Sequence, residues 1–336
     1  MPAIKNQQVR CEECGAILKG GTSALGCLNC LLLGSPNEPN PAARRFQHYE
    51  ICSRDGGATL DELGRGAMGI TYRAQDLNLF SEVALKVISS RYSGNDEARA
   101  RFRREARAAA QLRHPNVAAV FHFGETTGGR CFYAMELIEG ETVEARLRRT
   151  GPFSPIVALE VATQVGRALM VAEAHGLIHR DLKPSNLMVM ADDSVEPDTL
   201  VTKVIDFGLA KAAAITPIGP GRGARSFSGT PEFASPEQLN SDQMLIDIRS
   251  DIYSLGTILW YLLCGQTPFP GRAPGEVHDH RLPWEQLLPA HVPGPVAELL
   301  RSMLALDPFE RPQTARELLS ALQRCHQIIS NPSFSD

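Results

Sequence analysis

The residues with the greatest potential for chemistry lie in one short segment, His179–Asn186 (HRDLKPSN), and in the tripeptide DFG that begins at Asp206. Within six residues the segment holds a potential proton acceptor, Asp181, a cation, Lys183, and an amide, Asn186. Asp206 adds a second carboxylate beside a glycine. Such a set can position a hydroxyl, a phosphoryl group and a divalent metal in one cleft. Phosphoryl transfer depends on positioning and charge neutralisation more than on covalent chemistry.

Each of these side chains has a candidate role. Asp181 is the candidate general base for a substrate hydroxyl, and positioned proton acceptors typically contribute about 10²–10⁴-fold to a rate. Asn186 and Asp206 offer oxygen ligands for Mg²⁺, which prefers oxygen donors and substrate phosphates to a cage made only of protein. The alternative is a turn that is merely rich in polar residues, and the combination of all the elements disfavours it.

A glycine-rich segment supplies a candidate phosphate cover. Gly64, Gly66 and Gly69 have the spacing GxGxxG after a predicted strand. The spacing alone is a weak signal, and a plain glycine turn is the alternative. A dinucleotide-binding fold needs a helix to begin at the third glycine, whereas residues 70–72 (ITY) predict a strand. The pattern favours a hairpin whose backbone N–H groups cover phosphates.

Lys86 follows Gly69 by seventeen residues and lies within a predicted strand. A lysine on an apolar strand is usually an edge residue with a solvated tip. The alternative is an internal lysine that binds phosphate oxygens and is held by a carboxylate. Glu105, on the helix predicted to follow, is a suitable partner.

Four cysteines near the amino terminus form two CxxC pairs, Cys11 with Cys14 and Cys27 with Cys30, with twelve residues between the pairs. Two such knuckles can form a closed tetrahedral site for structural Zn²⁺, and the segment has too few apolar residues to fold without the metal. Two disulfides, an iron–sulfur cluster or a chance spacing remain alternatives. The other cysteines are scattered and predict reduced thiols: Cys52, Cys131, Cys264 and Cys325.

The bulk properties are those of an ordinary globular protein. The chain has 336 residues, 43% hydrophobic and 21% charged, with a net charge of −4. There is no general basic field to indicate a nucleic-acid partner. The longest apolar stretch, Ile252–Cys264, is shorter than the roughly 20 residues that a bilayer needs, so it predicts a buried helix. With no secretory signal and no membrane span recognised, we expect a cytoplasmic protein.

Composition divides the chain into segments. Residues 1–34 hold the cysteine module, residues 35–45 are a proline-rich linker, residues 46–325 form the main domain, and residues 326–336 are a flexible tail. Residues 46–137 favour an antiparallel sheet with one helix, and residues 138–325 favour helices. Strands are predicted at 60–63, 70–74, 81–89, 117–123, 131–137, 188–190 and 203–205, and helices at 96–112, 155–175, 251–264, 296–306 and 314–328.

In their order along the chain, these motifs resemble those of Hanks-type (eukaryotic-type) bacterial serine/threonine protein kinases. The resemblance runs from about Tyr49 to about Gln323 and includes the tripeptide SPE at residues 235–237. It implies an α+β, bilobed fold that transfers the γ-phosphoryl group of ATP, with Mg²⁺, to serine or threonine hydroxyls of protein substrates in signalling. Lys183, two residues after Asp181, is similar to the serine/threonine-specific pattern.

The resemblance also assigns nucleotide contacts. Residues 131–138 match the hinge between the lobes, so that Met135 backs the adenine pocket and the backbones of Glu136 and Ile138 bond the adenine. Thr71 stands where the family usually has a valine that packs on adenine. That departure implies a modest change in nucleotide affinity.

Two further residues match structural positions of the family. Asp251 matches the residue that braces the catalytic loop, and Arg311 matches the arginine that pairs with Glu237. Two other classes of function compete: a catalytically inactive kinase-like scaffold whose cysteine module docks a partner, and a kinase for small molecules. The intact catalytic set argues against the first, and the SPE tripeptide argues for protein substrates.

The segment between DFG and SPE is a candidate regulatory loop. It contains Ser226, Ser228 and Thr230, and Arg180 and Lys211 can bind a phosphate on it. We expect autophosphorylation at one of the two serines, with an unmodified loop as the alternative. Thr230 is better interpreted as a hydroxyl that helps to position the catalytic residues.

Overall fold

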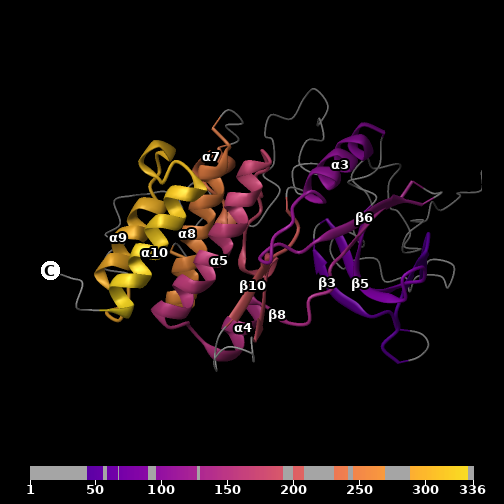
Figure 1. Ribbon diagram of the computed structural model, residues 1–336, viewed down its shortest axis with the longest axis horizontal. Coiled ribbons are helices and arrows are strands. Elements are labelled where there is room, and N and C mark those ends of the chain that lie inside the picture. Colours follow the sequence, from indigo (N-terminus) through magenta and orange to yellow (C-terminus); the bar gives the residue numbers. More distant parts are fainter. Residues whose placement is uncertain are drawn as a thin grey trace, which may run out of the picture.

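The computed structural model describes residues 44–55, 59–66, 68–89, 96–126, 129–191, 200–207, 231–240, 245–268 and 288–331. Within these residues the chain forms two lobes, a β-sheet with one long helix beside it and a larger group of helices (Figure 1). The predicted α+β, bilobed architecture is therefore confirmed. The cysteine module, the linker up to residue 43 and the tail from residue 332 lie outside this description.

The smaller lobe is built on an antiparallel sheet. Among the described residues its strands are β1 (Arg45–Phe46), β2 (Tyr49–Ile51), β3 (Glu62–Gly66), β4 (Gly69–Asp76), β5 (Ser81–Ile88), β6 (Val120–Glu125) and β7 (Cys131–Met135). They run in the order β1-β2-β4-β5-β7-β6, and β3 pairs with β4 outside this path. The central strands β5 and β7 are the most apolar, and all five residues of β7 are buried.

Helix α3 (Asp96–Ala109) packs against one face of this sheet. Its buried Phe102 meets the rings of Phe123 and Tyr133. The helix ends three residues before the predicted end at Leu112, because Gln111 and Leu112 make the tighter i→i+3 hydrogen bonds of a final turn.

The larger lobe is mainly helical. Its helices are α4 (Val143–Thr150), α5 (Pro155–Ala174), α7 (Pro236–Leu239), α8 (Ile248–Cys264), α9 (Gly294–Met303) and α10 (Ala315–Ser330). Local signals fix their ends. Ser154 caps α5 ahead of a proline in the first turn, and Gly265 ends α8 in the left-handed conformation that glycine adopts without strain.

Two long apolar helices form the centre of this lobe. The predicted buried helix at 252–264 is confirmed within α8, where Ile252, Ile258 and Leu262 have no exposed surface. In the part of the chain that the structure describes, α5 alone is long and apolar enough to cross a membrane by length and composition. However, 61% of that window is buried inside the fold, as in the core helix of a globular domain, so it is weak evidence for a span.

A second, smaller antiparallel sheet lies on the side of the helical lobe that faces the sheet lobe (Figure 1). It consists of β8 (Glu141–Thr142), β9 (Leu187–Ala191) and β10 (Leu200–Val204), in the order β10-β9-β8. The short strand predicted at 188–190 is confirmed within β9, which is one residue longer at each end. The strand predicted at 203–205 is confirmed as β10, which begins three residues earlier and ends one residue earlier. This sheet matters because the predicted catalytic segments flank its strands.

Candidate active site

The β9–β10 pair brings Asn186 and Asp206 to one place. The register pairs Leu187 with Val204, so the residues just before β9 and just after β10 are neighbours. The N–H of Ile205 extends this ladder by donating to the carbonyl oxygen of Asn186 at 3.0 Å. Two oxygen-bearing side chains that are twenty residues apart in the sequence therefore meet at the end of one hairpin.

The catalytic segment is closed on itself by short contacts. Lys183 Nζ lies 2.8 Å from Asp181 Oδ2, and Asn186 Nδ2 donates to the Asp181 carbonyl oxygen at 2.8 Å. The side chain of Asp181 remains 16% exposed, so its carboxylate is partly accessible to solvent. The structure thus brings together the predicted base, cation and amide.

Helix α8 holds the segment from behind. Asp251 accepts hydrogen bonds from the N–H groups of His179 at 2.6 Å and Arg180 at 2.8 Å, which confirms its predicted bracing role. Gln238 of α7 donates to the Arg180 carbonyl oxygen at 2.7 Å. Arg180 has a φ of 68°, a left-handed conformation that is strained for a residue with a side chain. The hydrogen bonds with Asp251 and Gln238 hold the Arg180 backbone in this conformation.

The carboxylate of Asp206 is bound at both of its oxygens. Lys86 Nζ binds its Oδ2, and the hydroxyl of Tyr133 donates to its Oδ1. Burial alone would raise the pKa of Asp206, but the charge and hydrogen bond of Lys86 and the hydroxyl of Tyr133 outweigh it and lower the pKa. Burial and the neighbouring carboxylate raise the pKa of Tyr133 well above its usual value of 10, so its hydroxyl acts as a donor.

The expected pairing of Lys86 with Glu105 is not made in this structure. Among the described residues, Glu105 Oε1 lies 3.6 Å from Arg104 Nη2, while Lys86 is bound to Asp206. The Glu105 charge also acts on Arg180. Burial lowers the pKa of Arg180, and the charges of Asp251 and Glu105 offset this only in part. The difference arises because Asp206 lies within reach of Lys86 and provides its carboxylate partner. Lys86 is nevertheless internal rather than solvated, with a side chain that is 11% exposed.

The hinge segment follows β7 as predicted. Met135 is buried at the end of that strand, and the Glu136 N–H donates to the Ala119 carbonyl oxygen at 2.8 Å. The carboxylate of Glu136 binds Lys203 Nζ at 2.8 Å, and the Ile138 carbonyl oxygen accepts from Gly140 at 3.0 Å. The hinge is therefore fixed to both lobes.

The three glycines of the predicted phosphate cover differ in what requires them. A Cβ on Gly69 would lie 2.0 Å from the Val87 carbonyl oxygen, so the close packing of β4 on β5 demands a glycine. A Cβ on Gly64 or Gly66 would meet nothing within 4 Å. Packing among the described residues does not explain those two glycines.

A buried ion pair joins α7 to the segment before α10. Arg311 Nη1 and Nη2 bind the two carboxylate oxygens of Glu237 at 2.8 and 3.0 Å, with 0% and 3% of the two side chains exposed. The Ser250 hydroxyl of α8 donates to the same carboxylate at 2.6 Å. The predicted pairing of Arg311 with Glu237 is confirmed.

Several predicted residues lie outside the described part of the chain. They are the four cysteines of the module, Gly208 of DFG, and the regulatory candidates Lys211, Ser226, Ser228 and Thr230. Conversely, the sequence did not single out Tyr133 or Gln238. Both act through tertiary contacts with residues 73 and 58 positions away, which no local pattern reveals.

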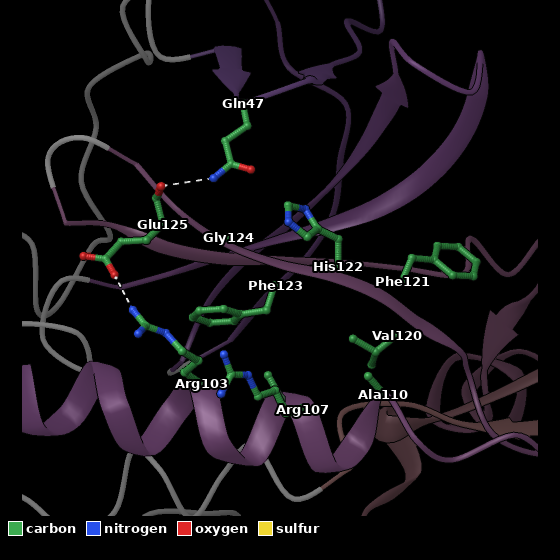
Figure 2. Close-up of a pocket in the computed structure, with 11 residues that line it drawn as sticks. Gln47, Arg103, Arg107, Ala110, Val120, Phe121, His122, Phe123, Gly124 and Glu125 are labelled. Atoms are coloured by element: carbon green, nitrogen blue, oxygen red, sulfur yellow. Dashed lines mark hydrogen bonds and ion pairs between the residues drawn. The ribbon is translucent and has the colours of Figure 1, made fainter.

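A hollow of about 450 Å³ lies between α3 and strand β6, at the edge of the sheet (Figure 2). Arg103 and Arg107 line it from the helix, and Phe121 lines it from the strand. Glu125 bridges two of its walls, since it contacts Gln47 through its carbonyl oxygen at 3.3 Å and Arg103 through its carboxylate at 3.2 Å. None of the predicted catalytic residues lines this hollow, so it is separate from the catalytic site.

The sequence pattern of the protein kinase domain family matches residues 58–323 of this chain, which is most of its length. This chain belongs to the protein kinase domain family. The match extends over both lobes and contains every kinase motif residue discussed above, from the glycine segment to Arg311. It excludes the amino-terminal cysteines.

Related proteins agree with this family. The kinase domain is 37% identical over 268 residues to the serine/threonine-protein kinase pkn3 of Myxococcus xanthus, a match that covers 78% of this chain and 48% of that protein. It is 36% identical over 271 residues to the serine/threonine-protein kinase PknB of Mycobacterium tuberculosis, covering 79% of this chain and 42% of PknB. The chain thus spans less than half the length of these relatives.

Solved structures support the fold. The kinase domain of Mycobacterium tuberculosis PknI is similar with a TM-score of 0.62 and 26% sequence identity. The similarity covers 83% of this chain and 97% of that kinase domain. The two lobes of the present kinase domain therefore have the arrangement of an experimentally determined relative.

Proposed function

We propose that this kinase domain transfers the γ-phosphoryl group of ATP to serine or threonine hydroxyls of protein substrates. The observation that carries the proposal is the group of Asp181, Lys183, Asn186 and Asp206 at the end of the β9–β10 hairpin, with Lys86 reaching it from the other lobe. Relatives with the same family domain are named serine/threonine-protein kinases, which supports the class of acceptor.

The residues at the site fit a divalent cation. Asn186 uses its amide nitrogen on the Asp181 carbonyl oxygen, which leaves the amide oxygen as a possible ligand. Asp206 provides a carboxylate whose pKa is lowered, so it is anionic at neutral pH. An amide oxygen and a carboxylate are the ligand types that Mg²⁺ accepts together with phosphate oxygens. When bound there, Mg²⁺ neutralises charge on the phosphates.

The side chains of this chain do the remaining work. The Asp181 carboxylate accepts the proton of the acceptor hydroxyl as its oxygen attacks the γ-phosphorus, and the bond to the ADP oxygen breaks. Lys183, 2.8 Å from that carboxylate, is placed to neutralise charge on the transferred group. Lys86 turns from Asp206 to phosphate oxygens of the nucleotide, a charge-assisted contact that its ammonium can make equally well.

The glycine segment supports the nucleotide part of the proposal. No described neighbour requires Gly64 or Gly66 to lack a side chain. A close approach of their backbone N–H groups to phosphates accounts for both glycines. Met135 and the hinge backbone at Glu136 and Ile138 remain the proposed contacts of the adenine.

The acceptor class is tested by product analysis. The protein is incubated with γ-labelled ATP, Mg²⁺ and a generic basic protein, and the labelled protein is hydrolysed to its phosphoamino acids. Phosphoserine or phosphothreonine is the expected product. Absence of label from both the kinase and the added protein would reject the proposal, and label confined to phosphotyrosine would reject the acceptor class.

We propose further that Cys11, Cys14, Cys27 and Cys30 bind one structural Zn²⁺. The support is their spacing alone, as these residues lie outside the described part of the chain. Elemental analysis is expected to find one zinc per chain in the purified protein and much less after Cys11→Ser. Absence of zinc from the purified wild-type protein, with iron or disulfides found in its place, would contradict the assignment. We propose also that the cysteine module docks a partner protein.

Regulation by phosphorylation and a cytoplasmic location complete the proposal. A phosphate at Ser226 or Ser228 can pair with Arg180 and Lys211 and order the loop between DFG and SPE. Mass spectrometry of active protein should detect it within residues 211–231, and an unmodified active protein would contradict it. The free thiols Cys52, Cys131, Cys264 and Cys325 support a reducing compartment such as the cytoplasm.

A further inference from the structure

A buried phenol, Tyr133, contacts the carboxylate of the proposed metal ligand Asp206. We propose that Tyr133 is a positioning residue, which holds Oδ1 of Asp206 so that Oδ2 is presented to a divalent cation. The inference rests on the proposed phosphotransferase function. It assigns this tyrosine a role in the Mg²⁺ requirement of nucleotide binding.

Strand register explains why Tyr133 reaches Asp206. Tyr133 of β7 is directly opposite Lys86 of β5 in the antiparallel pair, so the two side chains project from the same face of the sheet. Their polar ends meet the same carboxylate, Lys86 Nζ at Oδ2 and the Tyr133 hydroxyl at Oδ1. One carboxylate is therefore held by two neighbouring donors, one charged and one neutral.

The two donors differ in how they affect a cation. The Lys86 ammonium repels a divalent ion and must leave Oδ2 before the ion can bind, and the phosphates of a nucleotide offer it another partner. The Tyr133 hydroxyl carries no charge, and each carboxylate oxygen has further lone pairs. It can keep its hydrogen bond to Oδ1 while Oδ2 is exchanged between Lys86 and the cation.

Packing alone does not account for the hydroxyl. Tyr133 is 1% exposed, and its ring lies 6.2 Å from the ring of Phe102, a contact that phenylalanine would make equally well. A hydroxyl buried without a partner is costly, and this one finds its partner in Asp206. Phe102 belongs to α3, so Tyr133 also connects that helix to the carboxylate of Asp206.

The test is the Mg²⁺ dependence of ATP binding in Tyr133→Phe, measured by calorimetry with ATP over a series of Mg²⁺ concentrations and in EDTA. Loss of the hydrogen bond is expected to raise the Mg²⁺ concentration for half-maximal tightening of ATP binding roughly tenfold. ATP affinity in EDTA should change less than about twofold, because the carboxylate then has no metal to bind. Tyr133→Met, a second variant without the hydroxyl, is expected to behave alike.

Two controls separate positioning from packing. Tyr49→Phe removes the hydroxyl of another buried tyrosine of the same sheet, and Phe102→Leu loosens the packing beside Tyr133 without removing its hydroxyl. Both should keep the wild-type Mg²⁺ requirement, whatever their thermal stability.

An unchanged or lower Mg²⁺ requirement in both Tyr133 variants would overturn the proposal. So would an equal rise in Phe102→Leu, because the effect would then come from packing. Wild-type protein that binds ATP without any Mg²⁺ dependence would overturn the proposed function instead, which the wild-type titration reveals on its own.

Discussion

Three buried carboxylates show how the surroundings of a single side chain decide its charge. Burial raises the pKa of all three. The pKa of Glu237 is nevertheless lowered by its contact with Arg311, and the pKa of Asp206 is lowered by its contact with Lys86. The pKa of Asp251 stays raised, because the effect of burial outweighs the charge of His179 and the hydrogen bonds that Asp251 accepts from backbone N–H groups. A full cationic partner in direct contact makes the difference between them.

Glu237 therefore makes stability depend on pH. Its pKa is lowered in the folded protein, so the stabilisation is present above its usual pKa of 4.5 and is lost as the pH falls through the folded value. We expect the difference in the free energy of unfolding between wild type and Glu237→Gln to narrow from pH 7 towards pH 3. Urea unfolding across this range measures it. A difference that widens with acid would contradict the sign.

Removal of Arg311 is expected to be severe for the same reason. Arg311→Ala leaves the Glu237 carboxylate buried without its cation, and breaking a buried pair from one side costs about 3–5 kcal/mol of unfolding free energy. The matched control is Arg148→Ala, which breaks an exposed helical pair with Glu144 and should cost about 0.5 kcal/mol or less. Similar losses in the two variants, measured by chemical denaturation, would show that burial does not govern this pair.

Among the elements, the β3–β4 hairpin separates a structural glycine from a functional one. In Gly69→Ala the new methyl group would collide with the Val87 carbonyl oxygen, so β4 and β5 must move apart, at a cost of about 1–3 kcal/mol. Gly66→Ala meets no described neighbour, so its stability should stay within about 0.5 kcal/mol of wild type while ATP affinity falls.

Thermal unfolding and ATP titration of both variants check this division. Loss of stability in Gly66→Ala, or unchanged packing and stability in Gly69→Ala, would contradict it. Of these two variants, Gly66→Ala is the one that tests the proposed phosphate cover without disturbing the sheet.

The same elements show what local sequence can predict. The strand at 81–89 and the helices at 155–175 and 251–264 were predicted within a few residues, because apolar patterning, caps and terminating glycines mark them. Strands β1 and β2 are two and three residues long, too short for any periodicity, and were not predicted individually.

Site residues followed a similar rule. The Asp181–Asn186 segment was recognisable because its chemistry lies within six residues. The partner of Lys86 could not be recognised from the sequence, since Asp206 and Glu105 are both acidic. Only the placement of α3 and β10 in the fold decides between them. Tyr133 lies within the strand predicted at 131–137, and its hydroxyl finds its partner only when the fold brings β7 next to Asp206.

At the scale of the whole molecule, the proposed reaction requires both lobes to contribute to one site. The sheet lobe supplies Lys86 from β5 and Tyr133 from β7, and the helical lobe supplies Asp181, Asn186 and Asp206. The contact between Lys86 and Asp206 joins the lobes across the site. Phosphoryl transfer is thus assigned to the place where the two lobes meet, with the base on the helical side.

The most direct test of this account is the rate of phosphoryl transfer by Asp181→Asn, measured together with its affinity for ATP and Mg²⁺. Asparagine keeps the shape of the side chain and cannot accept the hydroxyl proton. The account predicts a fall in the transfer rate of about 10²–10⁴-fold with ATP affinity unchanged. Transfer at the wild-type rate by Asp181→Asn would contradict the assignment of the catalytic base and with it the proposed active site.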